Sequence, residues 1–319
     1  MLFALITWIR NLLFDTRIVK SRQHKNIFVL CIGNIRVGGT GKTPMAEYMI
    51  KNLKDEFPLA VVSLGYKRKT KGLRQVNVSD SASDTGDEPL QMKRKFSDVL
   101  FFVCKNRNTA VEHIHRHYPH VQLIILDDAF QYRKISPDKS VLLTEYRRPF
   151  FKDCIMPYGR LRELRQGYKR ADYIVVTKCP ENISQSEKEN FIKHIHPLKH
   201  QKVFFSFINY CLTDKEIRNK KILFVSGIDN PSPAVEYLQK TLICDVKLMK
   251  FADHHTFSTS DINLIKQNLT DNRILLTTEK DAVKLKETDL DFDVLAIENN
   301  IDEEFINTIR HELRKNCRS

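Results

Sequence analysis

The residues best suited to chemistry form a glycine-rich run at 38–44, Gly-Gly-Thr-Gly-Lys-Thr-Pro, between an apolar stretch at 27–32 and a helical pattern. Glycines allow backbone N–H groups to point inward at a polyphosphate, Lys42 adds positive charge at the outer phosphates, and Thr43 offers a hydroxyl to Mg2+. We therefore predict a nucleotide-binding loop, although Arg36 stands where the usual motif has its first glycine. The candidate nucleotide-binding residues are Gly38, Gly39, Thr40, Gly41, Lys42 and Thr43.

Two pairs of acidic residues could complete such a site. Asp127 and Asp128 follow an apolar stretch at 122–126, as expected of a strand whose final carboxylates hold Mg2+ directly or through water. Asp87 and Glu88 lie together in a predicted turn, where a carboxylate could take the proton of a hydroxyl nucleophile. A solvated acidic turn is the alternative for the second pair.

Two further residues could act at the site from other parts of the chain. His254 follows an aspartate and could reach across a cleft, oriented by that acid, although a surface histidine pair at 254–255 fits the pattern equally well. Lys178 follows a predicted strand at 173–177, where guanine-specific proteins have Asn-Lys-x-Asp. The final aspartate is missing, so guanine specificity is not predicted. Lys178 either lies along a nucleotide base or simply ends the strand.

Apolar runs alternating with helical patterns predict a mainly parallel sheet covered on both faces, a doubly wound α/β fold of the P-loop NTPase type. A second, smaller α/β unit is expected at 213–298, after a nucleotide-binding and catalytic domain at 25–212. The segment at 294–297 is expected to pair with 203–208, which would let a closing helix within 299–319 return to the first domain. The predicted strands of the first domain are 59–63, 99–103, 122–126, 141–144, 173–177 and 203–208, and those of the second include 222–226, 241–249 and 273–277.

The first 24 residues predict a membrane-interface helix followed by a basic segment. Residues 1–14 are apolar except at Arg10 and Asn11, and as a helix they would be about 20 Å long, too short for a hydrocarbon core of about 30 Å. Such a helix would lie in the interface, with Trp8 at the headgroup level. A helix packed on the protein's own core is the alternative. The basic residues that would meet anionic headgroups are Arg10, Arg17, Lys20, Arg22 and Lys25.

Composition narrows the classes of partner and the location. The formal net charge of +13 indicates an anionic partner, but no aromatic-basic interleaving or nucleic-acid reader motif occurs, so nucleic acid is not expected. Seven scattered cysteines form no Cys-x-x-Cys pair and suggest a reducing, cytosolic setting. The nucleotide-binding loop also fits two further classes of protein, a switch-type NTPase and a nucleic-acid-associated ATPase.

Taken together, these stretches resemble the tetraacyldisaccharide 4'-kinases of lipid A biosynthesis in Gram-negative bacteria. The similar stretches occur in the family's order, and the family's Asp-Asp-Gly-Phe-Gln is present with alanine at position 129. Its Ser-Arg-Gly-Tyr-Gly-Arg is present as Ser-Leu-Gly-Tyr-Lys-Arg at 63–68. The stretches that carry the resemblance are 33–34, 38–44, 86–89, 127–131, 159–163, 253–255 and 278–283.

The resemblance implies transfer of the γ-phosphate of ATP, with Mg2+, to the 4'-hydroxyl of tetraacyldisaccharide 1-phosphate. It implies a peripheral position on the cytoplasmic face of the bacterial inner membrane, and no obligate protein partner is predicted. By the same resemblance Asp87 activates the sugar hydroxyl and His254 assists it. Thr43, Asp127 and Asp128 lie at the metal and phosphates, and the expected residues lining the active site or substrate are Glu88, Arg162 and Glu163.

Overall fold

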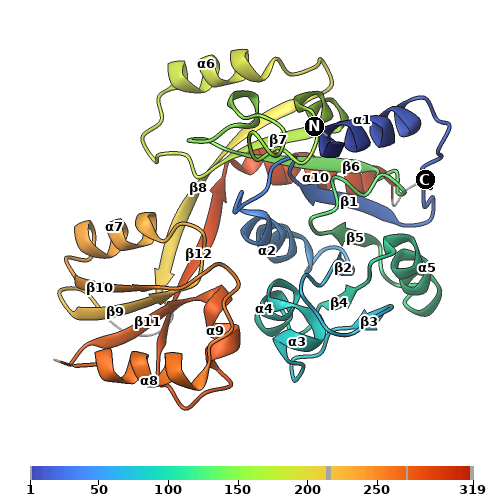
Figure 1. Ribbon diagram of the computed structural model, residues 1–319. Helices are drawn as coiled ribbons and strands as arrows, with labels where there is room; N and C mark the ends of the chain where they lie inside the picture. The colour runs from blue at the N-terminus through green and yellow to red at the C-terminus, as the bar shows by residue number, and fades with distance from the viewer. Residues whose placement is uncertain (1, 213–216, 271, 317–319) are drawn as a thin grey trace.

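Figure 1 shows the computed structural model of the chain, which describes residues 2–212, 217–270 and 272–316. Within these residues twelve strands form one mixed, mostly parallel sheet in the order β10-β9-β11-β12-β8-β7-β6-β1-β5-β2-β4-β3. Two pairings are antiparallel, β12 with β8 and β3 with β4. The predicted α/β class with a mainly parallel sheet is confirmed.

The first eight strands surround β1, which continues into the glycine-rich run. Parallel strands buried on both faces appear in a sequence as continuous apolar runs, and this is why the predicted strands at 59–63 and 173–177 match β2 and β7. The strands are β1 (Phe28–Gly33), β2 (Leu59–Ser63), β3 (Arg74–Gln75), β4 (Leu100–Val103), β5 (Leu123–Leu126), β6 (Lys139–Glu145), β7 (Tyr173–Thr177) and β8 (Lys202–Leu212).

Helices cover both faces of this part of the sheet because successive strand residues point to opposite sides. Leu30 packs in one core with helices α2, α4 and α10, whereas Val29 packs in another with α5 and α6. The helical elements are α2 (Lys42–Leu53), α3 (Ala82–Thr85), α4 (Asp87–Lys95), α5 (Arg107–His117), η1 (Phe150–Lys152), η2 (Arg165–Arg170), α6 (Gln185–Ile195) and α10 (Glu303–Asn316).

The remaining strands continue the same sheet. Helix α7 packs on one face of these strands, and α8 and α9 pack on the other. The elements are β9 (Lys221–Ser226), α7 (Ser232–Lys240), β10 (Asp245–Lys250), α8 (Thr259–Asn268), β11 (Ile274–Thr278), α9 (Glu279–Leu285) and β12 (Asp293–Ile301). The expected boundary between residues 212 and 213 falls at 213–216, which lie outside the described residues.

Strands β8 and β12 join the two parts of the sheet, as Figure 1 shows. The start of β8 pairs with β7, and its later residues pair antiparallel with β12. The strands that contain the two segments pair, but the pairing of 294–297 with 203–208 was wrong, because Ile297 lies opposite Tyr210 and it is Ile301 that lies opposite Ser206. Helix α10 then places Phe305 in the same buried core as Met45 of α2.

Several local predictions were wrong at their boundaries. The helical pattern expected after residue 44 begins earlier, because α2 starts at Lys42 with Gly41 in the left-handed conformation at its N-cap, and proline is tolerated in a first turn. The strand expected at 241–249 starts at Asp245, after a turn in which Ile243 has a φ of 55°. At residues 86–89, where a turn was expected, Asp87 is the first residue of α4.

Helix α1 (Leu2–Asp15) lies against the sheet domain at one end and exposes apolar side chains along its length. Arg133 donates to the carbonyl of Asn11, pairs with Asp15 at 2.7 Å, and stacks its guanidinium over Phe14. In the described chain, no helix has the length and apolar character needed to cross a bilayer. Five apolar residues of α1 are each 42–56% exposed: Leu5, Ile6, Trp8, Ile9 and Leu12.

The return of α10 to the first core can be tested by removing its central aromatic side chain. Phe305 is fully buried, and its ring centroid lies 4.9 Å from that of Phe204 and 6.3 Å from that of Tyr48. We expect Phe305→Ala to lower the free energy of unfolding by about 3–5 kcal/mol, measured by denaturant titration. His311→Ala, on the exposed side of α10, should change it by less than about 0.5 kcal/mol. Equal effects of the two changes would contradict this packing.

Candidate active site

The glycine-rich loop lies between the carboxyl end of β1 and the first turn of α2. Gly38 and Gly41 have φ angles of 113° and 85°, a region that residues with a Cβ rarely adopt. The predicted glycines therefore occur where the backbone requires them. A helix N-terminus directed at the loop adds free N–H groups and a positive dipole end, which together favour phosphate.

Neighbouring strands hold the loop in place. Asn34, fully buried after β1, donates from its amide to the hydroxyl of Thr40. Thr177, at the end of β7, donates to the Thr40 carbonyl at 2.9 Å, and the next residue, Lys178, donates to the Gly39 carbonyl. Hydrogen bonds from β1 and β7 therefore support the loop, and Lys178 lies beside it.

Arg36, which replaces the first glycine of the common motif, has a structural role instead. Its guanidinium is buried and pairs with Asp153 at 2.7 Å and with Glu145 at 3.3 Å. Val37 next to it donates to the Arg160 carbonyl. Because the chain at this position is extended and paired, a glycine is not needed until Gly38.

Lys42, Asp128 and Arg162 converge beside the loop. The ammonium of Lys42 lies 3.8 Å from Asp128 Oδ2, and Arg162 lies 3.2 Å from Asp128 Oδ1. Asp128 has a φ of 44°, so the left-handed residue of this turn is Asp128 itself, and alanine fits at position 129. One carboxylate thus bridges the two cations expected to face phosphate oxygens.

Asp127 is a buried carboxylate at the end of β5. Its Oδ2 accepts from Ser63 at 3.1 Å, whereas its Oδ1 has no hydrogen-bond partner among the described residues. Burial, together with the charges of Glu88 and Asp128, raises the pKa of Asp127 to about 7. An orphaned buried oxygen close to a second carboxylate suits a hard divalent cation such as Mg2+.

Asp87 stands at the N-terminus of α4, beside the end of β2. Its Oδ2 is 3.1 Å from His254 Nδ1 and 2.7 Å from Lys284 Nζ. Burial alone would raise the pKa of Asp87, but the bonds from His254 and Lys284 outweigh it and hold the pKa below its usual range. Asp87 is therefore a carboxylate at neutral pH, in contact with His254 as predicted.

The ring of His254 is oriented on its other side by Lys280. Lys280 Nζ lies 3.1 Å from Nε2, and an ammonium can only donate, so Nε2 accepts and the ring proton lies on Nδ1, facing Asp87. His254 itself has a φ of 60°, and the ring of Tyr66 contacts its edge. The histidine is thus held in one tautomer and one orientation.

Glu163 does not face solvent. Its side chain is fully buried and accepts from Arg170, from Asn11 of α1 at 2.8 Å and from Gln131 at 3.1 Å. Gln131 also donates to the Asn34 carbonyl. A continuous chain of hydrogen bonds therefore runs from α1 through Glu163 to the nucleotide loop.

Sequence reasoning gave no role to Lys284, Lys280, Ser63 or Gln131. The stretch at 278–283 contributed to the resemblance, and Lys284 follows it directly, so proximity to that stretch was the one available signal. The contacts themselves join residues far apart in the chain, and no local pattern encodes them.

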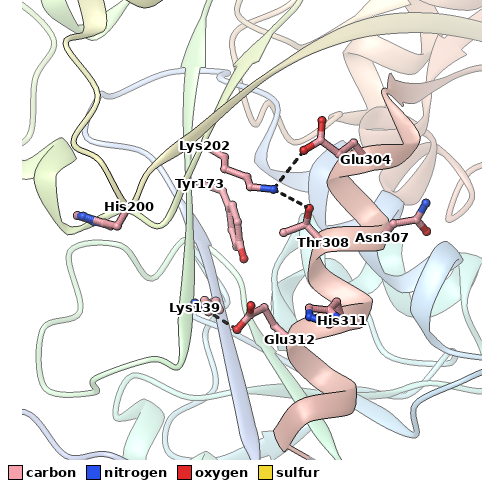
Figure 2. Close-up of a pocket in the computed structure, with 9 residues that line it drawn as sticks. All are labelled: Lys139, Tyr173, His200, Lys202, Glu304, Asn307, Thr308, His311 and Glu312. Carbon is pink, nitrogen blue, oxygen red and sulfur yellow. Dashed lines mark hydrogen bonds and ion pairs between the residues drawn. The ribbon is translucent and has the colours of Figure 1, made fainter.

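A separate cavity of about 470 Å³ lies at the opposite end of the strands from the loop (Figure 2). It sits between α10 and the amino ends of β6, β7 and β8, where Lys139 pairs with Glu312 and Lys202 with Glu304. In parallel α/β sheets ligands bind at the carboxyl ends of the strands, where the glycine loop lies. The candidate active site is therefore at the loop and not in this cavity.

A mostly parallel α/β sheet with a rigid glycine loop, a cationic Lys42 and buried carboxylates at strand ends defines a nucleotide-binding enzyme. A family model described as LpxK: Tetraacyldisaccharide-1-P 4'-kinase matches residues 1–314. The chain belongs to this family of tetraacyldisaccharide 4'-kinases. It is an ATP-binding phosphotransferase of lipid A biosynthesis.

Individual relatives agree with this membership. A tetraacyldisaccharide 4'-kinase of Flavobacterium johnsoniae is 39% identical over 298 residues, covering 91% of this chain and 86% of the relative. One of Bacteroides fragilis (strain YCH46) is 39% identical over 297 residues, covering 87% and 78%. The solved structure of LpxK from Aquifex aeolicus in complex with ATP is similar with a TM-score of 0.77 and 26% identity, covering 99% of this chain and 96% of that one.

The raised pKa of Asp127 predicts a pH-dependent stability in the absence of metal and nucleotide. The folded protein holds this proton more tightly than the unfolded chain, so the corresponding stabilisation is lost as pH rises from about 4 through about 7. We expect Asp127→Asn to melt at a higher temperature than the wild type at pH 8 and to differ much less at pH 5, with EDTA present. A difference that is the same at both pH values would contradict this assignment. Asp55→Asn, at an exposed position, is the control.

Proposed function

We propose that the chain transfers the γ-phosphate of ATP to the 4'-hydroxyl of tetraacyldisaccharide 1-phosphate with the residues described above. In this reaction a bond forms between the hydroxyl oxygen and the γ-phosphorus, and the bond to the ADP oxygen breaks. The hydroxyl proton passes to Asp87. The observation that carries this proposal is the Asp87 carboxylate, which is paired with both His254 and Lys284.

The residues from Gly38 to Thr43 would bind the phosphates of ATP. Mg2+, when bound by Thr43, Asp127 and Asp128, would neutralise the charge of the transferring group. The orphaned Oδ1 of Asp127 supports this ligand set. Lys42 and Arg162, which both contact Asp128, would turn to phosphate oxygens. Lys178, beside Gly39, would lie along the base.

Asp87 would serve as general base. Because His254 and Lys284 both contact Oδ2, Oδ1 is left for the acceptor hydroxyl. A weakly basic carboxylate suffices because phosphoryl transfer depends chiefly on positioning and charge neutralisation. Glu88 would line this region, since its charge reaches Asp127. Glu163 would act by orienting Gln131 and α1 from within the protein.

We further propose that residues 1–24 place the enzyme at the cytoplasmic face of the inner membrane. A lipid-borne hydroxyl must meet a nucleotide from the cytosol, which requires a site near the headgroups. The exposed apolar side chains of α1 support this placement, and the basic residues behind it suit an anionic surface. The hydrogen bond that Asn11 donates to Glu163 would hold that helix beside the nucleotide loop.

We also propose that the chain is divided into two domains. Residues 25–212 would act as a doubly wound domain of the P-loop NTPase type, with residues 213–298 as a smaller α/β domain joined through β8 and β12. The contact between Asp87 and His254 lies between these two parts and supports a site completed by both. Closure of one on the other would exclude water during transfer.

Replacing the candidate base tests the proposal directly. We expect Asp87→Asn to reduce kcat by about 100-fold or more, with ATP affinity retained, because the proton acceptor is lost while the nucleotide loop is untouched. Turnover is measured with labelled ATP and the disaccharide acceptor, and ATP affinity by calorimetry.

Asp55→Asn, at a position whose side chain is 86% exposed, serves as the matched control and should keep wild-type turnover. Near-normal turnover of Asp87→Asn would remove the base role. Label released only as inorganic phosphate by the wild type would instead point to a hydrolytic NTPase.

The membrane role of α1 can be tested without deleting the helix. Leu5→Ser, Trp8→Ser and Leu12→Ser combined change exposed positions and leave the contacts of Asn11 and Phe14 intact. We expect the variant to bind anionic lipid vesicles at least about tenfold more weakly, because burial of each apolar side chain contributes about 1.5–3 kcal/mol. Vesicle co-sedimentation is the measurement, and unchanged binding would reject the anchoring role.

A further inference from the structure

Lys284 is a lysine of α9 whose side chain is almost entirely enclosed, with 9% of it exposed. A buried ammonium group is costly unless it is paired. Its Nζ lies 2.7 Å from Asp87 Oδ2 and donates to the His255 carbonyl at 2.8 Å. One group therefore contacts both the candidate base and the loop that carries His254.

The position of Lys284 is fixed because α9 and α4 are joined at both ends. Asp87 and Lys284 meet where α4 begins and α9 ends. At the other end Lys95 lies 2.8 Å from Glu279 and 2.6 Å from Glu47 of α2. Between them Arg94 of α4 donates to a carbonyl of α9 at 3.0 Å. Lys284 therefore approaches Asp87 from a helix that is held rigidly against α4.

The charges around Asp87 come from three elements. His254 faces it from the loop before α8, Lys284 faces it from α9, and Glu88 follows it on α4. Lys280 lies behind the histidine and holds its Nε2. Lys284 thus contacts the carboxylate with an ammonium group, whereas His254 contacts it through a ring nitrogen.

We propose that Lys284 is a positioning residue for phosphoryl transfer, which keeps Asp87 anionic and its Oδ2 occupied while it holds the His254 loop in place. This inference rests on the proposed function, in which Asp87 accepts the hydroxyl proton. The bond to the His255 carbonyl stabilises a loop in which His254 has a left-handed backbone. Without Lys284 the carboxylate would rotate more freely and take up a proton at higher pH.

The test compares Lys284→Met, which removes the charge and keeps the length, with Lys284→Arg, which keeps the charge. We expect Lys284→Met to lower kcat at least about tenfold with KM for ATP unchanged, and to move the acid limb of the kcat profile upward by about 1–3 pH units, at saturating ATP and Mg2+. Lys284→Arg should keep the limb near its wild-type position. Lys286→Met, on an exposed neighbour, should match the wild type.

A double variant separates this role from a structural one. If Lys284 acts through Asp87, adding Lys284→Met to Asp87→Asn should cause no further loss of kcat. A lower melting temperature and kcat with an unmoved acid limb would overturn the inference, as would wild-type behaviour of Lys284→Met. Normal turnover of Asp87→Asn alone would instead refute the base role, so the two failures are distinguishable.

Discussion

The site depends on one long-range contact, the pairing of the Asp87 carboxylate with groups that enter the chain much later. His254 is 167 residues away in sequence, and Lys284 lies further still. A half-buried carboxylate would be costly as an anion, and these partners make it stable in that form. The rest of the fold must hold both sides of this contact in register.

The sheet provides that register through β8 and β12. Strand β8 pairs with β7 at its start and with β12 along the rest, so a single sheet runs through both parts of the molecule. The parts that carry Asp87 and His254 therefore share a backbone framework. The salt bridges of Lys95 with Glu47 and Glu279 add a second connection among α2, α4 and α9. Helix α2 after the glycine loop, helix α4 with the candidate base and helix α9 with Lys284 are therefore packed together.

A second network ties α1 to the nucleotide loop. Asn11 of α1 donates a hydrogen bond to Glu163, which also accepts one from Gln131. Gln131 in turn donates to Asn34, whose amide donates to Thr40 of the loop. Buried polar groups of this kind are costly to leave without partners. The polar core thus connects the apolar surface of α1 to the loop proposed to bind phosphate. A lipid kinase needs this proximity, since its two substrates come from different phases.

The sequence by itself determined the elements whose signals are local. The glycine loop, the carboxylates after the strand at 122–126 and the buried parallel strands follow from residue type and spacing, and the family follows from several such stretches in order. Tertiary structure alone decided that Asp87 begins a helix, that Lys284 meets its carboxylate, that Glu163 is enclosed, and that β12 pairs with β8 in a shifted register. These features rest on contacts between distant segments, whose free energies depend on burial and partner geometry that no short stretch of sequence contains.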